Sequence, residues 1–163
     1  MKPFVGVLFL LTFLPVNGAW SGASTVPFRQ YRTSVTPEAG ETLQGPCFYQ
    51  FLLPVTRRSV RAMFVIFDRG WQFGNLYRDP LVVDFAANHQ LGLLLAQHCR
   101  SKQCEDMNIV PEHGIERALL TELKQLAADS HHTELGRCPL IFFSFSGGGS
   151  LVARMAAYTP ART

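Results

Sequence analysis

Short apolar runs alternate along the chain with stretches in which apolar residues recur every three or four positions. Apolar runs of strand length are typical of β-strands covered on both faces, whereas the wider spacing is typical of amphipathic helices. The runs predict strands at 46–53, 60–67, 91–97 and 140–145. The spaced stretches and their flanking residues predict helices at 80–88, 111–130 and 146–158.

The region from Pro80 to His98 has two interpretations. Asp79 is a suitable N-cap and Pro80 suits the first helical position, so a helix is expected to begin here. It either continues to His98 or ends early and is followed by a buried strand. The polar residues at 88–90 and Gly92 favour the second interpretation.

The helix predicted at 111–130 is expected to present one apolar face to a core. The residues assigned to that face are Ile115, Leu119, Leu123, Leu126 and Ala127. The residues expected to face water are Glu116, Glu122, Lys124 and Gln125.

Strands and helices alternate over most of the chain, an order that predicts an α/β fold with a mostly parallel sheet and flanking helices. Residues 46–163 suffice for one domain and one core. Residues 20–45 are rich in Ser, Thr, Gly, Pro and Gln without a sustained period, and predict a loosely held N-terminal arm.

The N-terminus has the pattern of a secretory signal peptide. Lys2 precedes an apolar run at 3–14, and small residues follow near 18–23, so residues 1–19 are predicted to be removed. A membrane anchor is the alternative, but the run is shorter than the ~20 residues that span a bilayer. We therefore expect a secreted or periplasmic protein without a stable membrane anchor.

The formal charge of +3 at pH 7, with no cluster of Lys or Arg, argues against a nucleic-acid partner. The four cysteines suggest disulfides in an exported chain. Their spacing does not suit zinc. Three pairings exist; the short polar loop between Cys99 and Cys104 favours that pair and leaves Cys47 for Cys138.

The most informative stretch is Ser144-Phe145-Ser146-Gly147-Gly148, between the last predicted strand and the last predicted helix. Small residues around Ser146 permit a sharp reversal that holds a serine hydroxyl at the end of a sheet and the start of a helix. A plain glycine-rich turn is the alternative. A phosphate site at 147–149 is disfavoured because the Lys-Ser/Thr ending of a P-loop is missing.

From about Val60 to Thr163, the chain resembles the first half of the α/β-hydrolase superfamily, whose motif is small-x-Ser-x-small. Ser144 stands at the first small position, where glycine is commonest. The resemblance implies a secreted esterase or polyester depolymerase that cleaves small-molecule or polymeric esters through an acyl-enzyme on Ser146. It implies no cofactor and no metal, and leaves the oligomeric state open.

The same resemblance assigns an oxyanion hole. The amide of Gly147 would be one donor, and Gly70 or Trp71, in the loop after the strand at 60–67, would supply the other. The alternative is an ordinary turn with Trp71 packed as an apolar cover.

The superfamily's triad continues with an acid and a histidine after the serine, yet no Asp, Glu or His follows Ser146. His98 is expected at the same end of the sheet but about 10 Å away, two strand spacings. His131 and His132 are expected at the opposite end. We therefore expect an N-terminal part of a hydrolase, inactive alone; the alternative is a non-catalytic binding or structural module on this scaffold.

Overall fold

The computed structural model describes residues 26–56, 58–68, 73–100 and 111–163. The predicted signal peptide, the loop residues Gly70 and Trp71, and Cys104 lie outside these residues. The strands are β1 (Phe28–Val35), β2 (Cys47–Pro54), β3 (Ala62–Asp68), β4 (Leu91–Gln97) and β5 (Leu140–Phe143). The α-helices are α1 (Phe73–Arg78), α2 (Pro80–His89), α3 (Ile115–Ser130) and α4 (Gly147–Tyr158). Short 3-10 helices, η1 (Pro111–His113) and η2 (Thr133–Gly136), flank α3.

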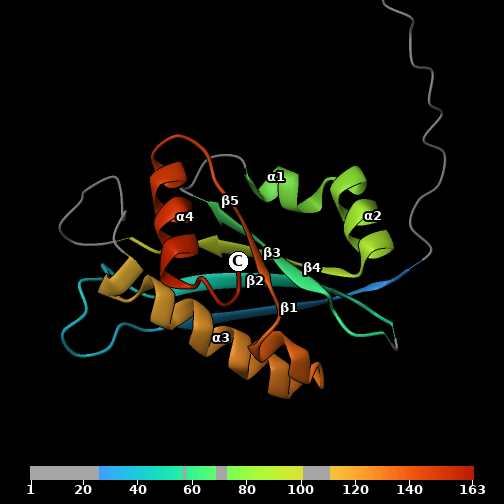
Figure 1. Cartoon of the computed structure of the whole chain (residues 1–163), viewed down its shortest axis with the longest axis horizontal. Helices are drawn as coiled ribbons and strands as arrows, with labels where there is room; N and C mark the ends of the chain where they lie inside the picture. The colour runs from blue at the N-terminus through green and yellow to red at the C-terminus, as the bar shows by residue number, and fades with distance from the viewer. Residues whose placement is uncertain (1–25, 57, 69–72, 101–110) are drawn as a thin grey trace, which may run out of the picture.

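The five strands form one mixed sheet in the order β1-β2-β4-β3-β5 (Figure 1). Strands β4, β3 and β5 are parallel, whereas β2 is antiparallel to both β1 and β4. The α/β fold class is therefore confirmed, with antiparallel strands on one side of the sheet.

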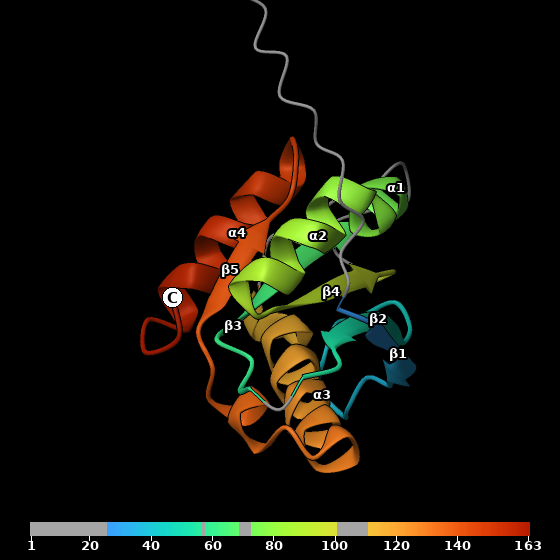
Figure 2. The same cartoon turned by 90° about the vertical axis from the view of Figure 1, so that its right-hand side faces the viewer.

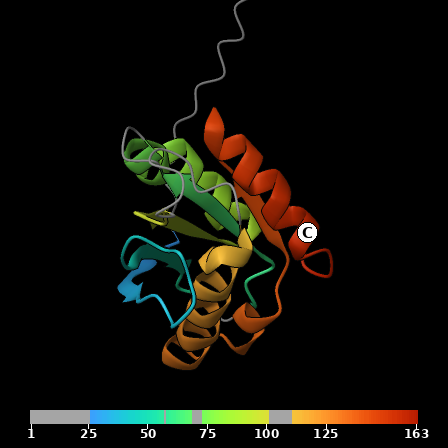
Figure 3. The ribbon, with the colours of Figure 1, turned by 90° about the vertical axis from the view of Figure 1, so that its left-hand side faces the viewer.

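Helices cover both faces of the sheet (Figures 2 and 3). Side chains alternate along the central strand β4, so Leu93 and Leu95 pack in the cluster beneath α1 and α2. Leu94 and Ala96 belong to the larger cluster formed with α3 and α4. Burial on both faces explains the continuous apolar runs of the central strands.

The region 80–98 is a helix followed by a strand, as predicted. The Asp79 carboxylate accepts a hydrogen bond from the Leu81 amide at 2.8 Å, and Gln90 ends α2 in a left-handed conformation. A Cβ at Gly92 would overlap the sulfur of Met63, so this glycine leaves room for the Met63 side chain on the neighbouring strand.

Strand β1 corrects the prediction of a loosely held arm over 20–45. Its eight residues pair in register with β2, from Phe28 opposite Pro54 to Val35 opposite Cys47. Because β1 is an edge strand with several exposed polar positions, its sequence lacks the apolar run that marks the central strands.

The buried face of α3 is as predicted for Ile115, Leu119 and Leu123, but Glu122 does not face water. Its exposed fraction is 4%, and the Thr33 hydroxyl of β1 donates a hydrogen bond to its carboxylate at 3.2 Å. Burial raises the pKa of the Glu122 carboxyl. Helical periodicity does not show that β1 extends over this side of the helix.

The predicted cysteine pairing is wrong: Cys47 is bonded to Cys99, and Cys138 is a buried free thiol. Because β2 is antiparallel to β4, the start of β2 lies beside the end of β4, and the two Cα atoms are 4.6 Å apart. Cys138 precedes β5 and therefore lies at the opposite end of the sheet. A disulfide is typical of proteins in an oxidising compartment.

Candidate active site

Ser146 lies in the sharp turn between β5 and α4, at the end of the sheet where the parallel strands finish. Its backbone has φ 55° and ψ −128°, a combination that residues with a side chain rarely adopt. Such a conformation costs about 1–3 kcal/mol and persists only where the surroundings enforce it. The residue is exposed at this end of the sheet.

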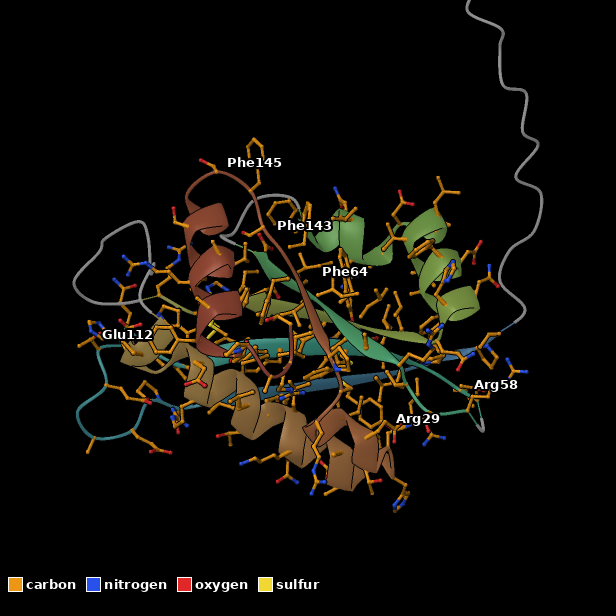
Figure 4. All side chains as sticks on the ribbon, in the orientation of Figure 1. Arg29, Arg58, Phe64, Glu112, Phe143 and Phe145 are labelled. Carbon is orange, nitrogen blue, oxygen red and sulfur yellow. A yellow bond between two sulfur atoms is a disulfide. The ribbon has the colours of Figure 1, made fainter. Side chains whose placement is uncertain are left out.

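The neighbours of Ser146 fix this turn. The Ser144 hydroxyl donates a 2.9 Å hydrogen bond to the carbonyl oxygen of Phe67 in β3. Phe145 points away from the sheet, and 74% of its surface is exposed (Figure 4). The serine at the position usually held by glycine therefore ties the turn to the adjacent strand, a contact that the motif alone did not reveal.

Helix α4 begins directly after Ser146. The amide of Gly148 donates to the carbonyl of Phe145 at 3.0 Å, and that of Gly149 donates to Ser146 at 2.8 Å. Gly147 is the first residue of the helix, a position whose amide has no acceptor within the helix. This amide lies next to Ser146 in the chain, and amides at a helix N-terminus favour a negatively charged group.

Strand β3 ends beside the turn, because β3 and β5 are parallel neighbours with Ile66 opposite Phe143. Its last residue, Asp68, accepts a 3.2 Å hydrogen bond from the side-chain amide of Gln97 in β4. The loop with Gly70 and Trp71 leaves β3 at this point, and these two candidate donors lie outside the described residues.

His98 lies at the same end of the sheet as Ser146 but follows β4, so β3 separates it from β5. Two strand spacings correspond to about 10 Å, which is too far for a hydrogen bond. Its ring packs against Phe48, with centroids 5.6 Å apart.

His131 and His132 lie before β5, at the far end of the sheet, and His132 contacts Glu134 at 2.9 Å. Within the described part of the chain, no histidine forms a hydrogen bond with Ser146. The structure therefore presents a serine in a strained turn without an adjacent base among these residues.

The described residues contain no group of three or more His, Cys, Asp or Glu side chains placed to hold a metal ion. None of the helices between Val26 and Thr163 that the structure describes is long and apolar enough to cross a bilayer.

No family model matches the sequence, and no curated protein matches it. Solved structures do match. An S-formylglutathione hydrolase from Agrobacterium tumefaciens has a TM-score of 0.56 at 13% identity, over 85% of this chain and 56% of that one. Esterase Est22 has a TM-score of 0.47 at 16% identity, over 82% of this chain and 39% of that one. A cold-adapted esterase from an Arctic intertidal metagenomic library scores 0.45 at 12% identity, covering 83% and 56%.

At these identities the likeness concerns the fold. Of these three structures, the S-formylglutathione hydrolase alone has a TM-score above 0.5. The chain spans about half of that hydrolase. The match covers 85% of this chain, whose described residues form the mixed sheet with helices on both faces. The chain therefore has a partial α/β-hydrolase-like fold.

Proposed function

We propose that this chain is the nucleophile-bearing part of an exported serine hydrolase that cleaves carboxylic esters. The observation that carries the proposal is the strained conformation of Ser146 at the junction of β5 and α4. Residues held in strained backbone conformations of this kind cluster at active sites and ligand-binding sites, where the strain is part of the mechanism. Glycines follow Ser146 at 147–149, and a plain connecting turn would take glycine at position 146 as well, because glycine adopts this conformation without strain.

In the proposed reaction the Ser146 oxygen attacks the ester carbonyl carbon, and its proton passes to a histidine base. The alcohol leaves with that proton, and water then hydrolyses the acyl-enzyme. The oxyanion would be held by the amide of Gly147 and by an amide of Gly70 or Trp71. The proximity of the ends of β3 and β5 supports this pairing of donors.

The acid and the histidine are proposed to come from polypeptide outside this chain, because its residues after Ser146 include neither. The outer edge of β5 supports this. Met63 of β3 donates to Pro139, whereas the Leu140 amide points the other way and donates to the carbonyl of Arg162. Backbone groups alternate along a strand, so Phe142 also faces this edge and can pair with a further strand.

The alternative is a non-catalytic binding or structural module. The observation that favours it is the lack of a histidine hydrogen-bonded to Ser146 in the described residues. In that case the Ser146 turn only connects β5 to α4.

Labelling with a fluorophosphonate probe, with mapping of the modified residue, tests the proposal. The mature chain should remain unlabelled, and a form that includes any coding sequence beyond Thr163 should be labelled at Ser146. Ser146→Ala should abolish labelling, while the control Ser150→Ala, exposed in α4, should keep it. Failure of the longer form, or a gene that does not continue, would favour the non-catalytic alternative.

A further inference from the structure

The segment between β2 and β3 contains two adjacent arginines, Arg57 and Arg58, and no other two Lys or Arg residues are adjacent in the sequence. Arg57 lies outside the described residues, whereas Arg58 and Ser59 are described and exposed. Arg58 lies at the outer margin of the molecule (Figure 4). Exposed loops with small and polar residues are where proteases most often cut folded proteins.

The backbone of Arg58 and Ser59 lies outside the strand ladders, because β2 ends at Pro54 and β3 begins at Ala62. The Arg58 amide donates a 3.1 Å hydrogen bond to the Thr56 hydroxyl, a local contact at the surface. The two strands joined here are not neighbours, because β4 lies between them in the sheet. The Arg58–Ser59 peptide bond can therefore extend into the cleft of a protease without the loss of any strand pairing.

The backbone that follows Ser59 is tied to the fold at two points. The Val60 amide donates to the carboxylate of Glu134 at 2.7 Å, and the Arg61 amide donates to the carbonyl of Gln90 at 2.8 Å. The Val60 side chain is buried. Release of Val60 and Arg61 is a local opening, which costs less free energy than global unfolding.

The two pieces made by a cut at this bond remain linked. The disulfide joins Cys47, which precedes the bond, to Cys99, which follows it. Strand β2 also stays paired with β4, and Tyr49 and Phe51 of β2 are buried in the core. A cut therefore divides the chain without removing an element from the fold.

We propose that the Arg58–Ser59 bond is a processing site for a serine protease that recognises paired basic residues. The product is a two-chain protein held together by the disulfide between Cys47 and Cys99. An arginine side chain directly before the cut bond fits the acidic pocket of a trypsin-like protease. The preceding arginine in the sequence selects this bond over those after single Lys or Arg residues.

The reaction consumes one water molecule. The bond between the carbonyl carbon of Arg58 and the nitrogen of Ser59 breaks, and that carbon gains the water oxygen and becomes a carboxylate. The Ser59 nitrogen takes the protons and becomes a terminal ammonium group. The site lies at the start of β3, the end of the sheet opposite Ser146, and needs neither that serine nor ester hydrolysis.

Incubation with a kexin-type protease, which cuts after paired basic residues, tests the proposal on the chain without residues 1–19, the predicted signal peptide. One cut is expected, and N-terminal sequencing of the new end should begin at Ser59. The cut chain should run as one band on a denaturing gel without reductant and as two bands with it. Its circular dichroism should match that of the uncut chain.

Arg58→Gln should slow the cut at least about a hundredfold, because the acidic pocket then lacks its partner. Arg61→Gln, which replaces an exposed single arginine, and Ser146→Ala should each be cut at the rate of the parent. The double variant Cys47→Ala/Cys99→Ala should give two bands even without reductant.

A peptide of residues 53–63 is the control for recognition of the sequence by the protease. If the peptide is cut and the folded chain is not, or if neither is cut, the bond is not a processing site. Separation of the cut parent without reductant, or loss of its circular dichroism, would overturn the two-chain product.

Discussion

Ser146 combines an exposed hydroxyl with a backbone conformation suited to glycine. Stability and the proposed chemistry therefore oppose one another at this position. The chain tolerates the strain because Ser144 anchors the turn to β3 and α4 begins at once. The sequence predicted the turn and the serine from the small residues around them. It could not reveal the role of Ser144, since that hydroxyl acts on a strand about 77 positions earlier.

Ser146→Gly should stabilise the fold by about 1 kcal/mol, because glycine adopts this conformation without a steric penalty. Ser150→Gly, inside the helix that follows, should destabilise it by about 0.5 kcal/mol, because serine lies between alanine and glycine in helix propensity. Urea unfolding of both variants measures the two effects. If Ser146→Gly is as destabilising as Ser150→Gly, the turn is not strained by its side chain.

The carboxyl of Glu122 predicts a dependence of stability on pH. Burial raises the pKa of this carboxyl in the folded chain. In the unfolded chain the carboxyl has the usual pKa of about 4.3, so the folded chain keeps its proton at pH values at which the unfolded chain has lost it. The free energy of unfolding should therefore fall as the pH rises from the unfolded pKa through the folded pKa. Each unit of raised pKa is worth about 1.4 kcal/mol.

Glu122→Gln should remove this fall, because glutamine carries no proton to lose and its oxygen still accepts from Thr33. Thermal unfolding between pH 4 and pH 8 compares the variant with the parent, and the stabilising effect should be larger at pH 8. Glu116→Gln, half-buried on the same helix, serves as the control. Equal pH profiles for parent and Glu122→Gln would contradict the prediction.

The elements that sequence predicted well are the buried central strands and a helix with a clear N-terminal cap. Strands β3 and β4 carry unbroken apolar runs, and α2 begins at a clear cap, so their type and approximate bounds follow from local pattern. Strand β1 was missed because an edge strand with one solvated face carries a weak signal. Pairing between strands depends on contacts far apart in sequence, and the order β1-β2-β4-β3-β5 could not be read from the spacing.

The disulfide between Cys47 and Cys99 is one of these contacts between residues far apart in sequence. It joins the start of β2 to the residue two places after β4, 52 positions further along the chain, and closes the loop between them. Constraining a loop of this size typically stabilises a fold by about 2–4 kcal/mol. The double variant Cys47→Ala/Cys99→Ala should lose that amount in urea unfolding.

Reduction of the parent with dithiothreitol should lower its unfolding midpoint towards that of the double variant, which should itself be insensitive to dithiothreitol. An unchanged midpoint on reduction of the parent would show that the disulfide does not contribute to stability.

The two edge strands of the sheet, β1 and β5, differ in the charge that they carry. Strand β1 carries the exposed residues Arg29 and Arg32, and charge on an edge strand discourages pairing with other chains. On the other side, no charged residue occurs between Arg137 and Arg154, a stretch that includes all of β5. Strand β5 therefore lacks the charges that discourage pairing, so a further strand can pair with this edge.

An apolar groove of about 560 Å³ adjoins the β5 edge, on the side covered by α1 and α2. Phe64 and Phe143 form part of its floor and lie beneath these helices (Figure 4). Three of its lining residues are large and well exposed: Leu81 at 60%, Phe85 at 57% and Ile141 at 44%. Edge and groove together form a continuous apolar surface of the kind that causes association when uncovered.

A chain without residues 1–19, the predicted signal peptide, should therefore self-associate as its concentration rises, and sedimentation velocity measures this directly. Phe85→Lys and Ile141→Lys should each reduce association, because they place a charge on the groove or beside the edge. Val55→Lys, an equally exposed apolar position between β2 and β3, should leave it unchanged. A parent chain that stays monomeric at high concentration would mean that this surface is not exposed in solution. A longer form in which further strands join β5 should lose the association, because the same surface would then be buried within one molecule.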